Sequence, residues 1–235
     1  MPHSPSRYNP RWEVAEQVAE VVRRRYGSQV RAIGVHGSLA HGDDHDGSDI
    51  DLVVVTRQPG AGPRPATRRI SGVIVDLVAI SGEEYLAHAR TLTTSWPLAA
   101  DQYLTTAAIV DPDNWYGLLR DTHLGRLAVA DAAEFATLAR EAWCRAAAAN
   151  DKARRLAEWY DTDAAMLVLG EARLGAALVE GLLSRTYFRN SADAVRRTRV
   201  AAEDVVTLGE RLAAQARELA RRGRPVDGEV ADLLA

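Results

Sequence analysis

The order of apolar and polar residues divides the chain into two parts with different periodicities. In the first part, short apolar runs bounded by glycine, proline and aspartate predict buried strands, at residues 30–37, 48–56, 70–81 and 103–112. Apolar positions at helical spacing predict helices around these strands, at residues 14–27, 82–92 and 113–122. The Pro/Gly-rich segment at residues 57–69 is expected to be a loop.

From about residue 130 onward, apolar residues recur only at helical spacing. Residues 130–160 predict a long amphipathic helix, and the more apolar segment at 164–188 predicts a helix at the centre of a bundle. We therefore expect an α+β protein. A mixed sheet with helices is expected over residues 1–125, followed by an all-α helical bundle over residues 126–235.

Composition and charge limit the classes of partner. The 235 residues carry a formal net charge of −3, which argues against a general electrostatic grip on nucleic acid or on anionic membranes. A phosphate-bearing ligand therefore needs a local cationic site, and Lys152 is the only lysine. The single cysteine, Cys144, excludes an internal disulfide and is typical of a reducing compartment. Neither a signal peptide nor a membrane-spanning run is recognisable, so we expect a cytoplasmic protein with no nucleic-acid or membrane partner.

Candidate chemistry is concentrated in the segment HGSLAHGDDHDGSDIDLVVVT, residues 36–56, in which aspartates adjoin an apolar run. An EF-hand loop with Gly47 in its sixth place has Gly42 first and Val53 twelfth, where acidic ligands are required, so this kind of calcium site is excluded. Three aspartates lie among turn-forming residues and are expected to be solvated: Asp43, Asp44 and Asp46.

Asp49 and Asp51 are different, because they lead into the apolar strand itself. Strand side chains alternate, so both carboxylates are expected on one face, roughly 6.6 Å apart. At an effective dielectric constant near 20, their repulsion is about 2.5 kcal/mol, which a divalent cation relieves. Asp76 interrupts the next apolar strand. Alone it is typical of a hydrogen-bonded structural residue, but if the two strands are neighbours it joins the aspartate pair.

Gly37 and Ser38 supply the other half of a predicted site. A strand that ends in Gly-Ser and leads into a short helix presents backbone N–H groups to an anion, and the serine hydroxyl adds a donor. Three carboxylates suit Mg²⁺, which keeps open positions for water and phosphate. A two-metal centre stabilises both the attacking and the leaving oxygen of an in-line displacement. The pattern thus predicts Asp49, Asp51 and Asp76 as metal ligands, one of which also takes the proton of an attacking hydroxyl.

The series Gly37-Ser38, Ser48-Asp49-Ile50-Asp51-Leu52 and Asp76 resembles the signature of the DNA polymerase β-like nucleotidyltransferase superfamily. The segments YGSQVRAIGVHGSL, SDIDL, SWPLAADQY and, at lower similarity, YFRNSADAV resemble in order those of the kanamycin nucleotidyltransferase family of aminoglycoside-modifying enzymes. The resemblance extends over about residues 14–200. It implies that residues 1–125 form a nucleotidyltransferase domain. It also implies that a Mg-bound nucleotide, ATP in the first instance, donates its nucleoside monophosphate to an aminoglycoside hydroxyl.

The same resemblance implies a homodimer whose active site lies between the nucleotidyltransferase half of one subunit and the helical half of the other. His41 stands where the family has a phosphate-contacting arginine, and Lys152 stands where it has a nucleotide-contacting lysine. The full set of implied nucleotide contacts is Gly37, Ser38, His41, Ser48 and Lys152. An aminoglycoside is polycationic, so acidic acceptor contacts are expected, at Asp101 and Glu141.

One departure from the family concerns the general base. The glutamate expected in this role corresponds to Ala148, which leaves Asp76 or Glu141 to accept the proton. Two other interpretations stay open: the same chemistry on a protein or another small aminated acceptor, and a nucleotide-binding homologue without turnover. The helical half argues against a protein acceptor, since minimal protein-modifying nucleotidyltransferases lack one. The intact aspartates argue against loss of turnover. Whether antibiotic resistance follows depends on the acceptor.

Overall fold

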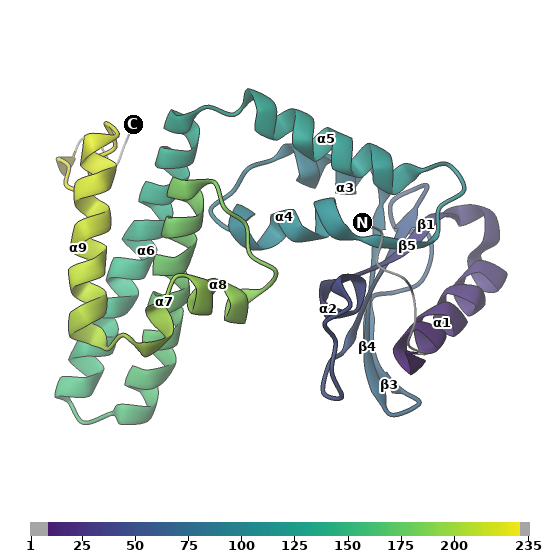
Figure 1. Cartoon of the computed structure of the whole chain (residues 1–235), viewed down its shortest axis with the longest axis horizontal. Helices are drawn as coiled ribbons and strands as arrows, with labels where there is room; N and C mark the ends of the chain where they lie inside the picture. Colours follow the sequence, from purple (N-terminus) through teal and green to yellow (C-terminus); the bar gives the residue numbers. More distant parts are fainter. Residues whose placement is uncertain (1–8, 231–235) are drawn as a thin grey trace. The chain divides into compact units, whose positions relative to one another are not determined.

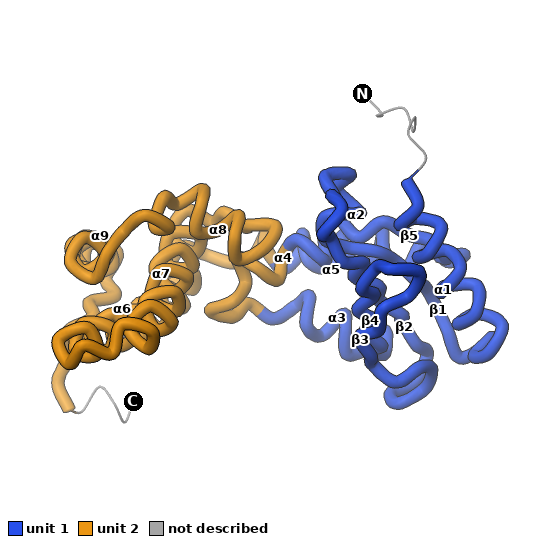
Figure 2. The backbone as a smooth tube through the Cα atoms, turned by 90° about the horizontal axis from the view of Figure 1, so that it is seen from below, with its two compact units in different colours: residues 1–91, 101–126 blue, residues 92–100, 127–235 orange. Residues whose placement is uncertain are grey.

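The computed structural model describes residues 9–230, which form two compact units (Figure 2). Unit 1 contains the chain up to Thr91 together with Asp101–Arg126, and unit 2 contains Leu92–Ala100 and the chain from Leu127 onward. Residues 1–8, whose polar sequence argues against a signal peptide, lie outside the described residues. No helix within the described range combines the length and apolar character that a membrane crossing requires.

Unit 1 is built on a five-stranded mixed sheet in the order β3-β4-β2-β1-β5 (Figure 1). The strands are β1 (Val30–His36), β2 (Ile50–Thr56), β3 (Ala66–Ile70), β4 (Val73–Ser81) and β5 (Ala107–Val110). β2 and β4 are parallel, and the other neighbouring pairs are antiparallel. The fold class expected from the sequence, α+β with a mixed sheet in the N-terminal part and a mostly helical remainder, is confirmed.

The alternation of side chains explains why helix α1 (Pro10–Tyr26) covers one face of this sheet. Ile50, Leu52 and Val54 of β2 point to that face and pack in one apolar core with Val14 and Val22 of α1. The helix begins where expected for its sequence: the Asn9 side chain accepts a hydrogen bond from the Arg11 backbone, and proline occupies the first turn.

The remaining helices of unit 1 are α2 (Gly37–His41), α3 (Gly82–Arg90) and α5 (Trp115–Val129), with the 3₁₀ turn η1 (Gly27–Gln29) before β1. Helix α4 (Trp96–Thr105) starts within unit 2 and ends within unit 1. The Tyr116 hydroxyl donates to the Val53 carbonyl of β2, and its ring lies where a side chain on Gly34 would point. Helix α5 therefore packs on the sheet face that α1 leaves free.

The hairpin formed by β3 and β4 corrects the prediction of a loop up to Arg69 followed by one strand from residue 70. β3 pairs with β4 through a two-residue turn, at which Ser71 and Gly72 both have positive φ, 49° and 86°. β3 is an edge strand whose residues are mostly exposed and include Arg68 and Arg69. An exposed edge strand lacks the apolar run by which strands are recognised, which explains the error.

Unit 2 is a helical bundle of α6 (Ala132–Glu158), α7 (Thr162–Ser184), α8 (Ser191–Arg197) and α9 (Val205–Arg221), with the 3₁₀ turn η2 (Val200–Ala202). The α6–α7 pair approaches closely because small residues meet between the helices. A Cβ added to Gly175 would lie 2.8 Å from the Ala146 Cβ. The bundle core is completed by Leu208 and Leu212 of α9, both almost fully buried.

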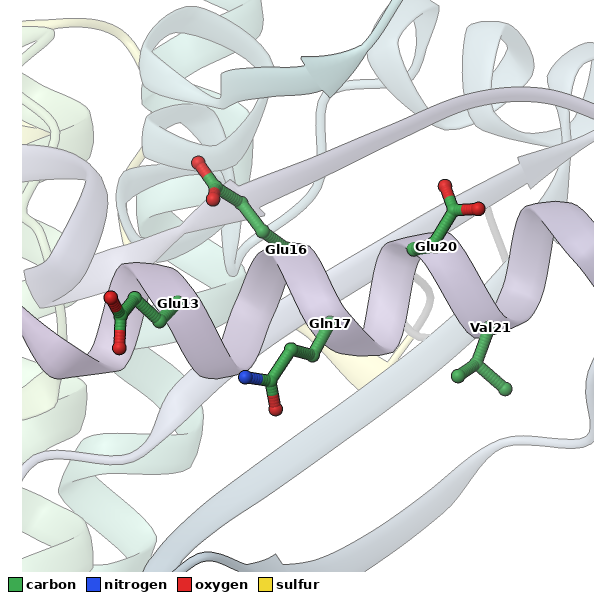
Figure 3. Close-up of a pocket in the computed structure, with 5 residues that line it drawn as sticks. All are labelled: Glu13, Glu16, Gln17, Glu20 and Val21. Carbon is green, nitrogen blue, oxygen red and sulfur yellow. The ribbon is translucent and has the colours of Figure 1, made fainter.

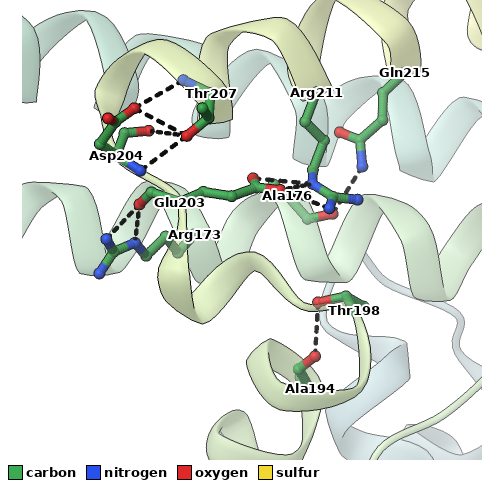
Figure 4. A network of polar contacts seen from close by, with 9 residues as sticks. All are labelled: Arg173, Ala176, Ala194, Thr198, Glu203, Asp204, Thr207, Arg211 and Gln215. Carbon is green, nitrogen blue, oxygen red and sulfur yellow. Dashed lines mark hydrogen bonds and ion pairs between the residues drawn. The ribbon is translucent and has the colours of Figure 1, made fainter.

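Polar contacts hold α9 to α7 and to the turn that precedes α9 (Figure 4). The Arg211 guanidinium donates to both carboxylate oxygens of Glu203, with Nε at 2.9 and 3.0 Å, and this contact raises the pKa of Arg211. Arg173 of α7 donates from Nε to the Glu203 carbonyl at 2.7 Å. The Gln215 side chain donates to the Ala176 carbonyl. These contacts pair Arg211, Arg173 and the side-chain nitrogen of Gln215 with groups of the bundle itself.

Candidate active site

Four polar side chains form one row across four neighbouring strands: Thr67, Asp76, Asp51 and His36. In the register of the sheet, Thr67 of β3 faces Asp76 of β4, Asp76 faces Asp51 of β2, and Asp51 faces His36 of β1. Residues directly opposite each other on adjacent strands project from the same face of a sheet. This face is the one opposite α1, because the intervening positions of β2 pack in the α1 core. β4 thus lies beside β2, which is the condition under which the sequence places Asp76 with the aspartate pair.

The carboxylates of this row are close enough to affect each other's ionisation. Burial raises the pKa of Asp51, the charge of His36 opposes that rise, and the charges of Asp49 and Asp76 add to it. Asp49 lies just before β2 and is exposed, whereas Asp51 and Asp76 are half-buried. The charges of Asp49 and Asp76 therefore both act on Asp51 at this end of the sheet.

Gly37 gives the Asp51 carboxylate the space it occupies. A Cβ built on Gly37 would lie 2.4 Å from Asp51 Oδ2, and the Gly37 backbone has a positive φ of 72°. Both the backbone conformation and the contact favour glycine over any other residue. The Gly-Ser turn and the aspartate strand, identified separately in the sequence, are thus in direct contact.

Asp76 is held from the other side. The Thr67 hydroxyl donates a hydrogen bond of 2.7 Å to Asp76 Oδ1. This bond orients the Asp76 carboxylate within the row and leaves Oδ2 for another partner. Sequence reasoning missed Thr67, because it lies in the segment read as a loop.

His41 and Asp101 form a pair at the end of α2. His41 Nε2 lies 3.1 Å from Asp101 Oδ1 and 3.0 Å from Asp101 Oδ2. The Asp101 side chain is 5% exposed and the His41 side chain 16%. Both residues belong to unit 1, although 60 positions separate them in the sequence. A direct contact of Asp101 with an acceptor requires this pair to open.

Three other residues of the predicted site lie elsewhere. Ser48 belongs to the loop before β2, and its hydroxyl accepts a hydrogen bond from the His45 backbone. Glu141 and Lys152 are exposed on α6, in unit 2. The nucleotide role of Lys152 and the acceptor role of Glu141 stay predictions.

One aspartate of the turn differs from expectation. Asp44 was expected to be solvated, but its side chain is 7% exposed and forms an ion pair with Arg11. The Asn9 side chain also donates to both Asp44 oxygens at 3.0 Å. Asp44 therefore ties the turn to the start of α1, which sequence position alone does not reveal.

A separate hollow on the surface runs along α1 and is lined by Glu13, Glu16, Gln17, Glu20 and Val21 (Figure 3). A single helix supplies all of these residues. Its three carboxylates repel phosphate, so this hollow does not compete with the row as a site for a nucleotide.

The donor set of the row fits a hard divalent cation by its chemistry. Asp49, Asp51 and Asp76 offer carboxylate oxygens, the donors that Mg²⁺ prefers, and their mutual repulsion is relieved by a cation. Within residues 9–230, no group of three or more histidine, cysteine, aspartate or glutamate side chains is arranged so that it could hold a metal ion. The backbone register places two of the three carboxylates side by side, and the third, on exposed Asp49, is unconstrained by burial.

Comparison with known proteins agrees with this geometry. Residues 15–95 match the nucleotidyltransferase domain family. The match contains β1 to β4, and with them the Gly37 turn and all three aspartates. The match ends before β5 and before α6, so it includes four of the five strands and none of the helical bundle.

Two solved structures resemble the chain at low similarity. A nucleotidyltransferase-like protein from Exiguobacterium sibiricum is 14% identical, with a TM-score of 0.45, and the alignment covers 88% of this chain and 75% of that one. A toxin–antitoxin structure with AMP-PNP is 16% identical, with a TM-score of 0.31, covering 48% of this chain and 86% of that one. Similarities of this size carry no argument about activity. No curated protein matched the sequence.

His36 is the second residue of the row that sequence reasoning missed. No pattern of partner residues in the sequence around His36 marks it as part of a site. Its position as the last residue of β1, directly before Gly37, was the available signal. A side chain at that position lies opposite Asp51 once β1 and β2 pair.

Proposed function

We propose that this chain is a Mg-dependent nucleotidyltransferase that moves AMP from ATP onto a hydroxyl of an aminoglycoside antibiotic. The observation that carries the proposal is the in-register pair of Asp51 and Asp76 beside Gly37, within a region that matches the nucleotidyltransferase domain family. Carboxylates next to a glycine turn combine a place for divalent cations with a place for phosphate.

In this reaction the acceptor oxygen attacks the α-phosphorus of ATP, and the bond from that phosphorus to the oxygen bridging to the β-phosphorus breaks. Pyrophosphate leaves with the electron pair, and the acceptor proton passes to a carboxylate. Asp76 suits that role, because Thr67 holds its Oδ1 and leaves Oδ2 to accept the proton. The backbone at Gly37 and the Ser38 hydroxyl bind the departing phosphates.

Asp49, Asp51 and Asp76 would hold Mg²⁺, which when bound neutralises the charge that develops on the phosphate oxygens. The register of β2 and β4 keeps these carboxylates close together, although their negative charges repel one another. Such stored repulsion is typical of a site that gains stability when its ligand binds.

The aminoglycoside acceptor rests on the sequence resemblance described above. Exposed Glu141 on α6 offers an acidic contact for a cationic acceptor, and exposed Lys152 on the same helix offers a cation for the nucleotide. We further propose a homodimer in which these α6 residues complete the active site of the other subunit. Light scattering at micromolar concentration tests this part, and a monomer would contradict it.

The function is tested by incubating the protein with Mg-ATP and a panel of aminoglycosides, then measuring the products by mass spectrometry. We expect an acceptor mass increased by one adenylate and release of pyrophosphate. Asp49→Asn should abolish both while the melting temperature stays within a few degrees. Asp113→Asn is the matched control, since Asp113 is exposed and makes only a long ion pair of 3.9 Å with Arg57.

Each other outcome has a definite meaning. Transfer that survives Asp49→Asn within tenfold contradicts the assignment of the aspartates. If pyrophosphate is released and adenylate is found on the protein itself, the acceptor is a protein and not an aminoglycoside. Absence of ATP binding in the presence of Mg²⁺ contradicts the proposed function altogether.

A further inference from the structure

The His41–Asp101 pair sits one helical turn from the glycine of the phosphate-binding turn. Gly37 and His41 are the first and last residues of α2, four positions apart, and residues with this spacing lie on one face of a helix. His41 therefore lies on the same face of α2 as Gly37.

Asp101 contacts His41 in a way that constrains its protons. Both carboxylate oxygens lie within 3.1 Å of Nε2, and the Asp101 side chain is almost fully buried on α4. A buried carboxylate needs hydrogen-bond donors, and the contacts that the structure gives this one are both with Nε2. Nε2 of His41 must therefore carry a hydrogen, which it donates to Asp101.

The second ring nitrogen is the one left to meet a ligand. Nδ1 of His41 has no hydrogen-bond partner among residues 9–230, and the ring is only partly buried. The oxygens of a fully ionised polyphosphate accept hydrogen bonds and do not donate them. Contact with phosphate therefore requires a hydrogen on Nδ1 as well as on Nε2, which is the imidazolium form.

We propose that Asp101 is a positioning residue, which accepts the Nε2 hydrogen of His41 and so orients the ring for Nδ1 to bind the polyphosphate of the nucleotide. This inference rests on the proposed function, because it deepens the account of how the same site holds ATP. In this proposal the partly buried His41, held by buried Asp101, contacts the phosphates, and Asp101 does not contact the acceptor directly.

The test is a double-mutant cycle on nucleotide affinity, measured by calorimetry with a non-hydrolysable ATP analogue and Mg²⁺. His41→Gln should weaken binding by about tenfold or more, because it removes a charge-assisted hydrogen bond. Asp101→Asn should also weaken binding, and it should add little in the His41→Gln background, because Asp101 acts through His41. His41→Arg should retain affinity and make binding less sensitive to Asp101→Asn.

Matched controls separate this role from general damage. His88→Gln removes an exposed histidine of α3, and Asp113→Asn removes an exposed aspartate; both should bind like the wild type. Asp101→Glu keeps the charge and should bind more tightly than Asp101→Asn, which supplies a second readout if the asparagine variant loses stability. The melting temperature of every variant is recorded.

Three results overturn the inference while leaving the proposed function intact. The first is an unchanged nucleotide affinity in Asp101→Asn, and the second is that the effects of the two single variants on affinity simply add. The third is that Asp101→Asn raises only the KM of the acceptor. The third result would indicate that Asp101 contacts the acceptor. If the wild type binds no analogue in the presence of Mg²⁺, the proposed function fails, and this inference fails with it.

Discussion

Replacing Gly37 by alanine probes the contact between the glycine turn and the aspartate strand. The new Cβ would lie 2.4 Å from Asp51 Oδ2, whereas real Cβ contacts essentially never fall below 3.0 Å. The carboxylate must therefore move by about 0.6 Å or rotate away, since the alternative is a shift of the backbone. The substitution thus displaces one proposed metal ligand without touching its chemistry.

Two terms set the expected loss of stability. A non-glycine residue at positive φ costs about 1–2 kcal/mol, and an Asp51 side chain forced off its rotamer costs about 0.5–1.5 kcal/mol more. The free energy of unfolding should therefore fall by about 1.5–3.5 kcal/mol. Displacing a positioned group by about 1 Å costs on the order of 100-fold in rate, so we expect activity to fall by about 10–100-fold.

Gly42, the C-cap residue of the same short helix, offers a matched control. It has φ of 70°, against 72° for Gly37, but a Cβ at Gly42 would meet nothing within 4 Å. Gly42→Ala should therefore show the backbone strain of about 1–2 kcal/mol without the loss of activity. Urea unfolding gives the stabilities, and pyrophosphate release gives the rates of both variants.

The comparison can refute the reasoning directly. If Gly37→Ala retains activity within threefold of Gly42→Ala, the position of the Asp51 carboxylate does not affect the reaction. If both variants lose activity alike, the strained turn matters and the contact with Asp51 does not.

Further predictions concern three side chains. Thr67→Val removes the hydrogen bond to Asp76 and should lower kcat several-fold while shifting the melting temperature by only a few degrees. Thr67→Ser keeps the hydroxyl and should retain the rate. An unchanged kcat in the valine variant would contradict a role for this bond. Burial lowers the pKa of His123, so the folded state binds a proton more weakly than the unfolded state, and stability should fall as the pH decreases from about 7 to about 5. His123→Asn should flatten this decline in melting temperature, and a curve parallel to that of the wild type would show that other groups cause it. Lys152→Ala should weaken binding of the ATP analogue by several-fold and Lys152→Arg by less; equal affinities would place Lys152 on a merely solvated helix face.

The sequence by itself determined the elements whose apolar pattern reports their burial. β2 was recognisable because both its faces are covered, so that Leu52, Val53, Val54 and Val55 form an unbroken apolar run. The helical half was recognisable because α6 repeats small and apolar residues at helical spacing. The same apolar pattern made three carboxylates recognisable, because a charged side chain within or next to an apolar strand is unfavourable unless it has a partner. These are Asp49, Asp51 and Asp76.

Only the tertiary structure decided what lies beside what. The row from Thr67 to His36 depends on strand register, and a shift of one residue would turn each side chain to the other face. β3 escaped recognition because an exposed edge strand needs no apolar run. His41 pairs with Asp101, which is 60 positions away in the sequence. Local sequence preferences do not predict contacts between residues so far apart. Periodicity records whether a residue is buried, while the partners of a polar side chain are set by packing of the whole unit.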